Sequence, residues 1–389
     1  MGEYPRGGVV DPRFAEVAEA FEANFAAGNE IGAGVCVYQH GQPVVDLWAG
    51  YADLQQRQPW RADTLGVLAS PTKALVAASA LLLVDRGVLE LDTPIARYWP
   101  EFAANGKDTI TLRMILSHRS GVVCLDHSPI TAQALKEHTP IAEALAAASP
   151  QWEPDTAHGY HAVTFGHLVS ELIRRRTGAT VGQFFAKEIA APLGLDCYIS
   201  IPNPDTVHLA TMQQSKAEDL MEGGDAGEMT MLIDRTTLTY RATIGSLDLE
   251  HLPEPTLEDP SYGGRGSAQS MARFFAALIG DVDGVRLLSP ETVDQMRTLH
   301  SSGPCQVMLM PCNWGLGVQV PDHAVFPASV GLTTAFGLSG ANGSYVFADP
   351  EHNLSFAYIQ NAGSQEMGAL DRRTGALIKG VYRSLGKLG

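Results

Sequence analysis

A serine and a lysine stand three residues apart at the start of an apolar stretch, in the tetrapeptide Ser70-Pro71-Thr72-Lys73. Pro71 suits the first position of a helix, which places Ser70 at the helix N-terminus and Lys73 on the same face. A serine hydroxyl is a weak nucleophile, and a lysine buried in a cleft can lose its proton and serve as its base. The positive end of the helix also favours developing negative charge. The tetrapeptide therefore indicates nucleophilic acyl chemistry at Ser70.

Context separates this tetrapeptide from a chance match. Serine often caps a helix and lysine often lies on a surface, and a second copy stands at Ser384-Leu385-Gly386-Lys387. That copy contains a glycine and no helix follows it. The first copy is followed by residues 74–84, which are apolar on nearly all sides of a helix. A helix over 71–86 is therefore predicted to be buried on all sides, together with its lysine.

Two further segments could act with this pair. Tyr160, in Gly159-Tyr160-His161-Ala162, precedes a helix predicted over 163–176, and a tyrosine beside an ammonium group could relay a proton. Its alternative role is ordinary packing. Small residues fill the segment 336–344 before a predicted strand, which would let a ligand approach the backbone closely. Its alternative role is a glycine-rich turn.

Other kinds of site are not expected. The histidines at 158, 161 and 167 match no zinc spacing, and the glycines at 263–266 follow no clear strand, so we expect no metal and no cofactor. The net charge of −16 argues against nucleic acid and anionic membranes as partners. The apolar run is too short for a membrane span. The five cysteines and the absence of a signal-peptide pattern favour a soluble, cytoplasmic protein, with free thiols rather than a functional bridge at Cys305 and Cys312. The oligomeric state stays open.

The order of predicted elements indicates an α/β (α+β) fold. Tight turns between strands imply an antiparallel sheet, which the N- and C-terminal parts share between flanking helices. The expected parts are an α/β lobe over 1–91, an inserted, mostly helical lobe with an acidic excursion over 92–245, and the rest of the α/β lobe over 246–389. The expected helices are 11–28, 71–86, 132–148, 163–176, 268–279 and 367–384; the expected strands are 34–38, 43–48, 314–320, 343–348 and 354–360; the irregular acidic stretch is 215–260.

The three segments, taken together and in order, resemble the serine β-lactamase and penicillin-binding-protein superfamily, and most closely class C β-lactamases and family VIII carboxylesterases. Ser70-Pro71-Thr72-Lys73 matches the family motif Ser-x-x-Lys. Further segments typical of the family are 92–100, 116–121, 192–195 and 347–350. The resemblance covers most of the chain and implies a β-lactamase/transpeptidase-like fold.

The resemblance also implies roles for individual residues. Ser70 would be the nucleophile, with Lys73 and Tyr160 as a shared general base and acid. The backbone N–H groups of Ser70 and Ala341 would form the oxyanion hole, worth several kcal/mol in the barrier. The residues expected at the substrate are Leu338, Ser339, Gly340, His161 and Ala162.

Two departures from the lactamase pattern bear on the substrate. Tyr-x-Asn reads Tyr160-His161-Ala162 here, and Lys-Thr-Gly reads Leu338-Ser339-Gly340. Losing the lysine removes a charge-assisted contact to a substrate carboxylate, worth about 1.5–3 kcal/mol. We therefore expect a carboxylesterase for short or compact acyl esters. The alternatives are a β-lactamase, D-amino-peptidase or amidase, an acyltransferase, and a non-catalytic binding protein that keeps the fold.

Overall fold

The larger sheet joins the two ends of the chain. A computed structural model describes residues 4–125, 129–213, 233–247, 254–322, 324–364 and 369–388. Within them, seven strands form an antiparallel sheet in the order β1-β3-β2-β11-β10-β9, with β4 pairing with β3, and a smaller sheet has the order β6-β8-β5-β7. The strand bounds are β1 (Arg6–Val10), β2 (Gly32–Gln39), β3 (Gln42–Asp53), β4 (Gln58–Pro59), β5 (Thr64–Val67), β6 (Cys197–Tyr198), β7 (His208–Leu209), β8 (Arg265–Gly266), β9 (Phe336–Ser339), β10 (Tyr345–Asp349) and β11 (Leu354–Gln360). The predicted sharing of one antiparallel sheet is confirmed.

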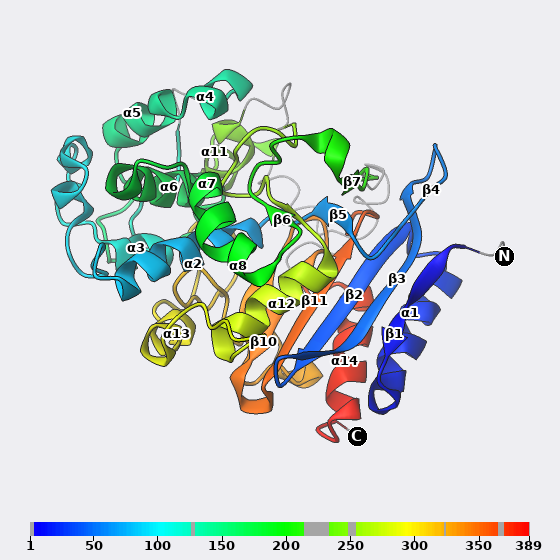
Figure 1. Ribbon diagram of the computed structural model, residues 1–389. Coiled ribbons are helices and arrows are strands. Elements are labelled where there is room, and N and C mark those ends of the chain that lie inside the picture. The colour runs from blue at the N-terminus through cyan, green and yellow to red at the C-terminus, as the bar shows by residue number, and fades with distance from the viewer. Residues whose placement is uncertain are drawn as a thin grey trace.

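The middle of the chain is mostly helical. Figure 1 shows α3 to α7 and α11 gathered on one side of α2, away from the larger sheet. The helix bounds are α1 (Ala15–Ala26), α2 (Thr72–Asp85), α3 (Leu112–Leu116), α4 (Ala132–Glu137), α5 (Thr139–Ala147), α6 (Thr164–Thr177), α7 (Val181–Phe185), α8 (Ala191–Leu193), α11 (Leu238–Ala242), α12 (Ala268–Ile279), α13 (Pro290–Arg297) and α14 (Arg372–Ser384). Much of the acidic excursion, residues 214–232 and 248–253, lies outside the described residues. The lobe boundaries at 91 and 245 stay a prediction.

Strand β2 shows how the larger sheet is covered on both faces. Its side chains alternate, as in any strand. Val35 and Val37 join the core cluster that contains residues of α1 and α14. Cys36 and Tyr38 join the other cluster, which contains residues of α2 and α12. The strand is therefore buried on both sides, with α1 and α14 packed together on one face and α12 on the other (Figure 1).

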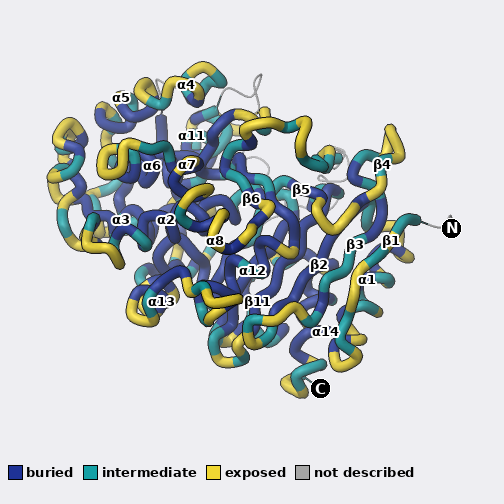
Figure 2. Tube along the Cα trace, in the orientation of Figure 1, coloured by how far each residue is buried: buried dark blue, intermediate teal, exposed yellow. Residues whose placement is uncertain are grey.

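Helix α2 is buried on all sides, as its apolar sequence predicts. Eleven of its fourteen residues are buried, among them the polar Thr72, Lys73 and Ser79. The tube in Figure 2 runs dark blue along α2, between the surrounding helices and the sheet. The helix begins at Thr72, one residue later than expected, with Pro71 at the position before it. Burial on every side fixes the direction in which its first turn presents Ser70 and Lys73.

The strand expected over 314–320 is wrong. Its residues form isolated bridges instead, between Trp314 and Gln319 and between Gln319 and Gly337 of β9. Gly317 has φ of 73°, and a side chain there would meet Ala77 of α2. The chain therefore turns tightly where it passes the helix, which interrupts the strand ladder. Strand β9, which lies in the segment of small residues at 336–344, is the edge strand of the sheet at this end.

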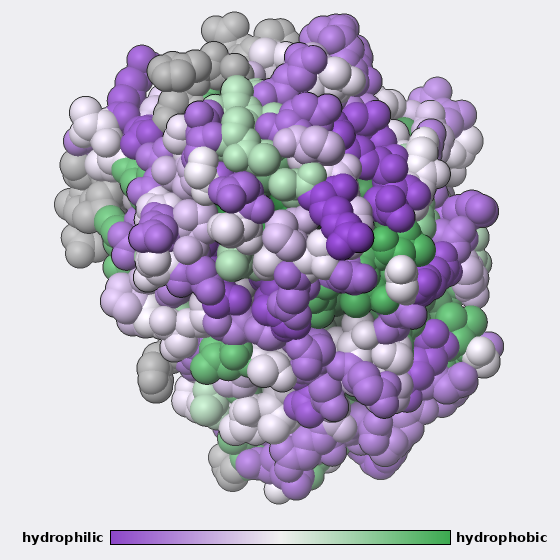
Figure 3. Space-filling model, turned by 90° about the vertical axis from the view of Figure 1, so that its left-hand side faces the viewer, coloured by the Kyte–Doolittle hydropathy of each residue, from purple (hydrophilic) through white to green (hydrophobic). Residues whose placement is uncertain are grey.

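One face of the molecule is largely polar. The face shown in Figure 3 is mainly hydrophilic, with smaller apolar areas between the polar residues. In the part of the chain that the structure describes, no helix is both long enough and apolar enough to span a bilayer.

Candidate active site

A strained turn carries Ser70 out of the smaller sheet. Strand β5 ends at Val67, and Ala69 adopts φ of 55°, which is uncommon for a residue with a side chain. Thr72 holds the turn because its hydroxyl donates to Ala69 O at 2.7 Å and accepts from the Gly264 N–H at 3.0 Å. Ser70 itself is only partly buried, so its hydroxyl remains reachable.

Tyr160 meets this serine directly. Its hydroxyl oxygen lies 2.7 Å from Ser70 Oγ, although the two residues are far apart in the sequence. The tyrosine ring is stacked on Trp314, with centroids 5.3 Å apart and planes within 3° of parallel. Its backbone N–H donates to Cys305 Sγ at 3.2 Å. These contacts fix the ring and therefore the position of its hydroxyl at Ser70.

Lys73 is held beside the tyrosine. Its side chain is only 1 % exposed, and Nζ lies 4.9 Å from the centre of the Tyr160 ring. Nζ donates to Ala162 O at 2.7 Å and to Ser261 O at 2.9 Å. Carbonyl oxygens accept hydrogen bonds but donate none, so the lysine nitrogen is the donor in both contacts. The arrangement places a buried positive charge next to a tyrosine that touches a serine.

Neutral histidines surround this charge. Burial, with smaller contributions from His161 and from the Lys73 charge, holds the pKa of His118 well below its usual range. Burial also lowers the pKa of His161 to about 4. The His161 ring lies 2.6 Å from Ser120 Oγ and 2.7 Å from Gly159 O, and its side chain is fully buried. A direct contact between His161 and a substrate therefore stays a prediction.

His161 should make the stability of the protein depend on pH. Its pKa is about 4 in the folded protein, against about 6.5 for an exposed histidine, so below pH 6.5 the unfolded chain binds more protons. Lowering the pH from 7 to 5 therefore costs about 2 kcal/mol of unfolding free energy through this residue alone. The free energy of unfolding, measured in urea, should therefore differ less between pH 7 and pH 5 in His161→Asn than in the wild type, by about that amount. The exposed His40→Asn is the control, and equal pH dependence in both variants would contradict the assignment.

The segment 338–341 lies against the turn that leads to Ser70. A side chain at Gly340 would come within 2.8 Å of Leu68 O, so the two segments touch through their backbones. Leu338 is buried in the core cluster that contains α2, and the Ser339 hydroxyl lies 3.3 Å from Gln319 Oε1. Ala341 is exposed at the tip of the turn.

Several residues that shape this site were not expected from the sequence. Ser261, which the sequence did not indicate, contributes a main-chain carbonyl to Lys73, and a carbonyl carries no residue-type signal. Ala162 was expected at the substrate, but its contact with Lys73 is also made by its main-chain carbonyl. Trp314 forms the floor under Tyr160, but its segment resembled a strand of the sheet. The sequence contains no pattern that connects these segments, because the contacts are made only in the folded chain.

The sequence matches a known protein family over most of its length. Residues 17–379 match the protein family described as Beta-lactamase. The Esterase/beta-lactamase LipL of Mycobacterium tuberculosis is 34 % identical over 369 residues, which cover 91 % of this chain and 82 % of that protein.

Solved structures agree with this match. The crystal structure of a family VIII carboxylesterase superposes with a TM-score of 0.86 and 31 % identity, covering 98 % of this chain and 100 % of that one. A penicillin-binding protein homologue from Caulobacter crescentus gives a TM-score of 0.85 and 32 % identity, with the same coverage of both chains.

Proposed function

The chain belongs to the beta-lactamase family and is a serine hydrolase, and from that premise we propose that it is a carboxylesterase acting through an acyl-enzyme on Ser70. The observation that carries the proposal is the 2.7 Å contact between Tyr160 Oη and Ser70 Oγ. A nucleophile within hydrogen-bond reach of a proton acceptor, which a third group stabilises, is the arrangement that acyl transfer requires. Here the third group is Lys73. The substrates we propose are short or compact acyl esters.

The residues divide the reaction between them. Tyr160, as the phenolate stabilised by the Lys73 ammonium, accepts the proton of Ser70 while Oγ bonds to the acyl carbon. The oxyanion is bound by the N–H groups of Ser70 and Ala341. When the C–O bond of the ester breaks, Tyr160 returns the proton to the leaving alcohol. Water then attacks the acyl carbon on Ser70 and gives its proton to Tyr160. Tyr160 returns this proton to Ser70 Oγ as the acid leaves.

The structure supports Tyr160 rather than Lys73 as the direct base. Tyr160 Oη lies 2.7 Å from Ser70 Oγ, whereas Lys73 Nζ donates to the carbonyls of Ala162 and Ser261. Those two contacts hold the Lys73 nitrogen beside the Tyr160 ring, 4.9 Å from its centre. We therefore assign Lys73 the role of a fixed charge.

The side chains near the site favour esters over β-lactams. The position where the lactamase pattern has lysine is Leu338, which is 2 % exposed and packed in the core. A substrate carboxylate would therefore find no cation at this position. The asparagine of the lactamase pattern is Ala162, whose carbonyl accepts from Lys73. Neither residue can bind the polar groups of a β-lactam with its side chain.

Hydrolysis of β-lactams is the second candidate, and one observation favours it. LipL, which is 34 % identical to this chain, is described as both an esterase and a beta-lactamase. The same Ser70 would act in either reaction. Amide hydrolysis and acyl transfer to an acceptor other than water would also use this site.

The deciding experiment compares substrate classes on one preparation. Initial rates are measured with p-nitrophenyl butyrate and with the cephalosporin nitrocefin, and a fluorophosphonate is used to label the nucleophile for peptide mass spectrometry. We expect a much higher kcat/KM for the ester and a single label on Ser70. Efficient nitrocefin turnover with poor ester turnover would establish the second candidate instead. A label on another serine would remove Ser70 from the mechanism.

The compartment is a separate part of the proposal. All five cysteines are buried thiols. Thiols persist in reducing compartments, whereas exported proteins often carry disulfides. This supports the cytoplasmic location that we propose, which fractionation of cells making a tagged full-length chain would check.

A further inference from the structure

The turn that follows β9 has a free donor at its tip. Gly343 N–H donates to Gly340 O at 2.8 Å, and Gly340 N–H donates to Ser344 O at 2.7 Å. These two bonds close a tight turn with Ala341 and Asn342 at its centre. Among the described residues, the N–H groups of Ala341 and Ser70 make no hydrogen bond. Within this part of the chain, both donors are therefore available to a ligand.

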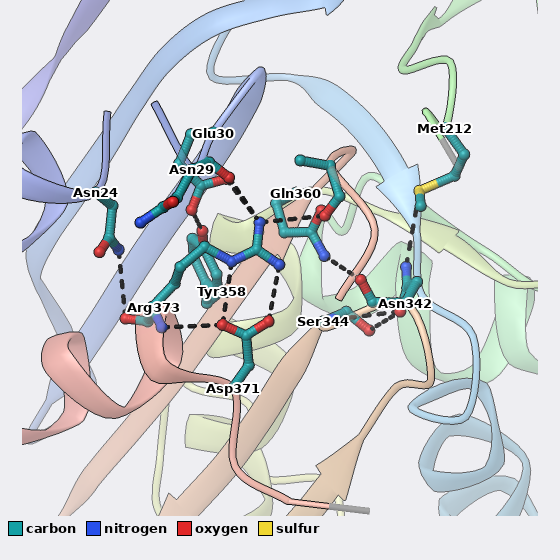
Figure 4. Close-up of polar contacts among 11 residues, drawn as sticks. Asn24, Asn29, Glu30, Met212, Asn342, Ser344, Tyr358, Gln360, Asp371 and Arg373 are labelled. Carbon is teal, nitrogen blue, oxygen red and sulfur yellow. Dashed lines mark hydrogen bonds and ion pairs between the residues drawn. The ribbon is translucent and has the colours of Figure 1, made fainter. Parts of the chain in front are cut away.

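Asn342 connects this turn to strand β5. Its Nδ2 donates to Val67 O at 2.8 Å, and its Oδ1 accepts from the Ser344 N–H at 3.2 Å. One side chain thus binds both the turn and the last residue of the strand that leads to Ser70. Figure 4 shows Asn342 and Ser344 side by side, with the contact between them.

Ser344 makes the neighbouring connection. Its side chain is fully buried, and its hydroxyl donates to Leu68 O. The side chains of Asn342 and Ser344 therefore bind two consecutive carbonyls, those of Val67 and Leu68. The next residues are the strained Ala69 and then Ser70, so little free backbone separates these anchors from the serine.

A second group of contacts holds the turn from behind. Gln360 of β11 is fully buried and its Nε2 donates to Asn342 O. A side chain at Gly343 would meet Gln360 Nε2 at 2.7 Å and Arg373 Nη2 at 3.2 Å, so the turn rests on these two residues. Arg373 is in turn fixed by Asp371, with Nη2 and Oδ2 2.8 Å apart (Figure 4). The turn is thus supported on the side away from Ser70.

We propose that Asn342 and Ser344 are positioning residues that set the distance between the N–H groups of Ala341 and Ser70. The inference rests on the proposed function, which assigns these two donors to the oxyanion. The proposal requires no contact between either side chain and the substrate, because both side chains bind the carbonyls of Val67 and Leu68. Their effect is to couple the two halves of the oxyanion hole, which come from distant parts of the sequence.

The size of the effect follows from what the donors contribute. Losing one oxyanion donor typically costs about 10²–10³-fold in kcat, and a displaced donor costs part of that. We expect Ser344→Ala to lower kcat for p-nitrophenyl butyrate about 10-fold, with KM changed less than about twofold. KM should change little because the donors act mainly on the charge that develops in the transition state.

Ser355→Ala provides a matched control. Ser355 is also fully buried, and its hydroxyl donates to a backbone carbonyl, Ala272 O, at 2.6 Å. That contact joins β11 to α12 and lies outside the proposed machinery. Both variants lose one buried hydroxyl that donates to a backbone carbonyl, and both should lose thermal stability, but only Ser344→Ala should lose kcat. Asn342→Ala, at a less buried position, is the second variant if Ser344→Ala folds poorly.

The experiment measures kcat and KM for the ester, the rate constant for inactivation by a fluorophosphonate, and Tm for all variants. We expect kcat and the inactivation rate constant to fall together in Ser344→Ala and Asn342→Ala, and neither to fall in Ser355→Ala. Unchanged inactivation and kcat in both turn variants would overturn the inference. If the wild type is labelled at Ser70 but hydrolyses no ester, the proposed function fails, while the inactivation rates still test the positioning role.

Discussion

Replacing Ser70 by alanine is expected to lower kcat for p-nitrophenyl butyrate by about 10⁴-fold or more. The hydroxyl that forms the acyl-enzyme is removed, and losses of this order are typical for a nucleophile that acts as one unit with its base. The fold should persist, because Ser70 is partly exposed and the turn around it is held by Thr72 and Gly264. The measurement is the initial rate of ester hydrolysis, with the concentration of active enzyme set by fluorophosphonate titration of the wild type.

Ser79→Ala is the matched control for this variant. Ser79 lies on α2, the helix that follows Ser70, is fully buried, and donates to Leu75 O at 2.8 Å. The kcat of Ser79→Ala should stay within about threefold of the wild-type value, because the Ser79 hydroxyl serves packing within the helix and takes no part in the reaction. A Ser70→Ala protein that is folded and retains a tenth of the wild-type rate would show that another residue attacks the ester.

Replacing Tyr160 by phenylalanine is expected to lower kcat by about 10²–10⁴-fold, the usual contribution of a positioned general base. The variant loses only the oxygen 2.7 Å from Ser70 Oγ. The ring should remain stacked on Trp314 and above Lys73, so KM and Tm should change little. Steady-state kinetics and thermal unfolding of the same preparations measure both.

The control for Tyr160→Phe is the same change at Tyr382. That tyrosine is fully buried, and its hydroxyl donates to Asp349 Oδ2 at 2.7 Å, on the α14 side of the sheet. Tyr382→Phe should lower Tm and leave kcat unchanged. If Tyr160→Phe retains more than about a third of kcat, Lys73 must take the proton of Ser70 itself, and the assignment of the two roles is reversed.

The parts of the fold that the sequence predicted are those with strong local patterns. The apolar stretch after Ser70 predicted a helix buried on all sides, and α2 is one. The hairpin of β2 and β3, the final strand β11 and the antiparallel sheet shared by the two ends were also expected and are confirmed. The pattern failed at 314–320, because tight packing of Gly317 against Ala77 outweighed the strand preference of its neighbours.

The candidate site was predictable in its side chains and not in its main-chain partners. Ser70 and Tyr160 were expected to work together, and their hydroxyls are in contact. The carbonyls that hold Lys73 and the anchors of Asn342 could not be expected, since backbone atoms are the same in every residue. The roles of all these residues stay predictions until the variants are measured.

The pairing of β2 with β11 has a consequence for how the protein is made. The two strands lie near opposite ends of the chain, so the sheet is completed only when the last part of the chain is available. At about 5–20 residues per second, ribosomal synthesis of the 300 or so intervening residues takes about 15–60 s. During that time β2 lacks its edge partner β11 and the helices α12 and α14, which later cover its two buried faces. The nascent chain therefore has a long interval in which association with a chaperone competes with aggregation, and the turn bearing Ala341 joins Ser70 only at its end.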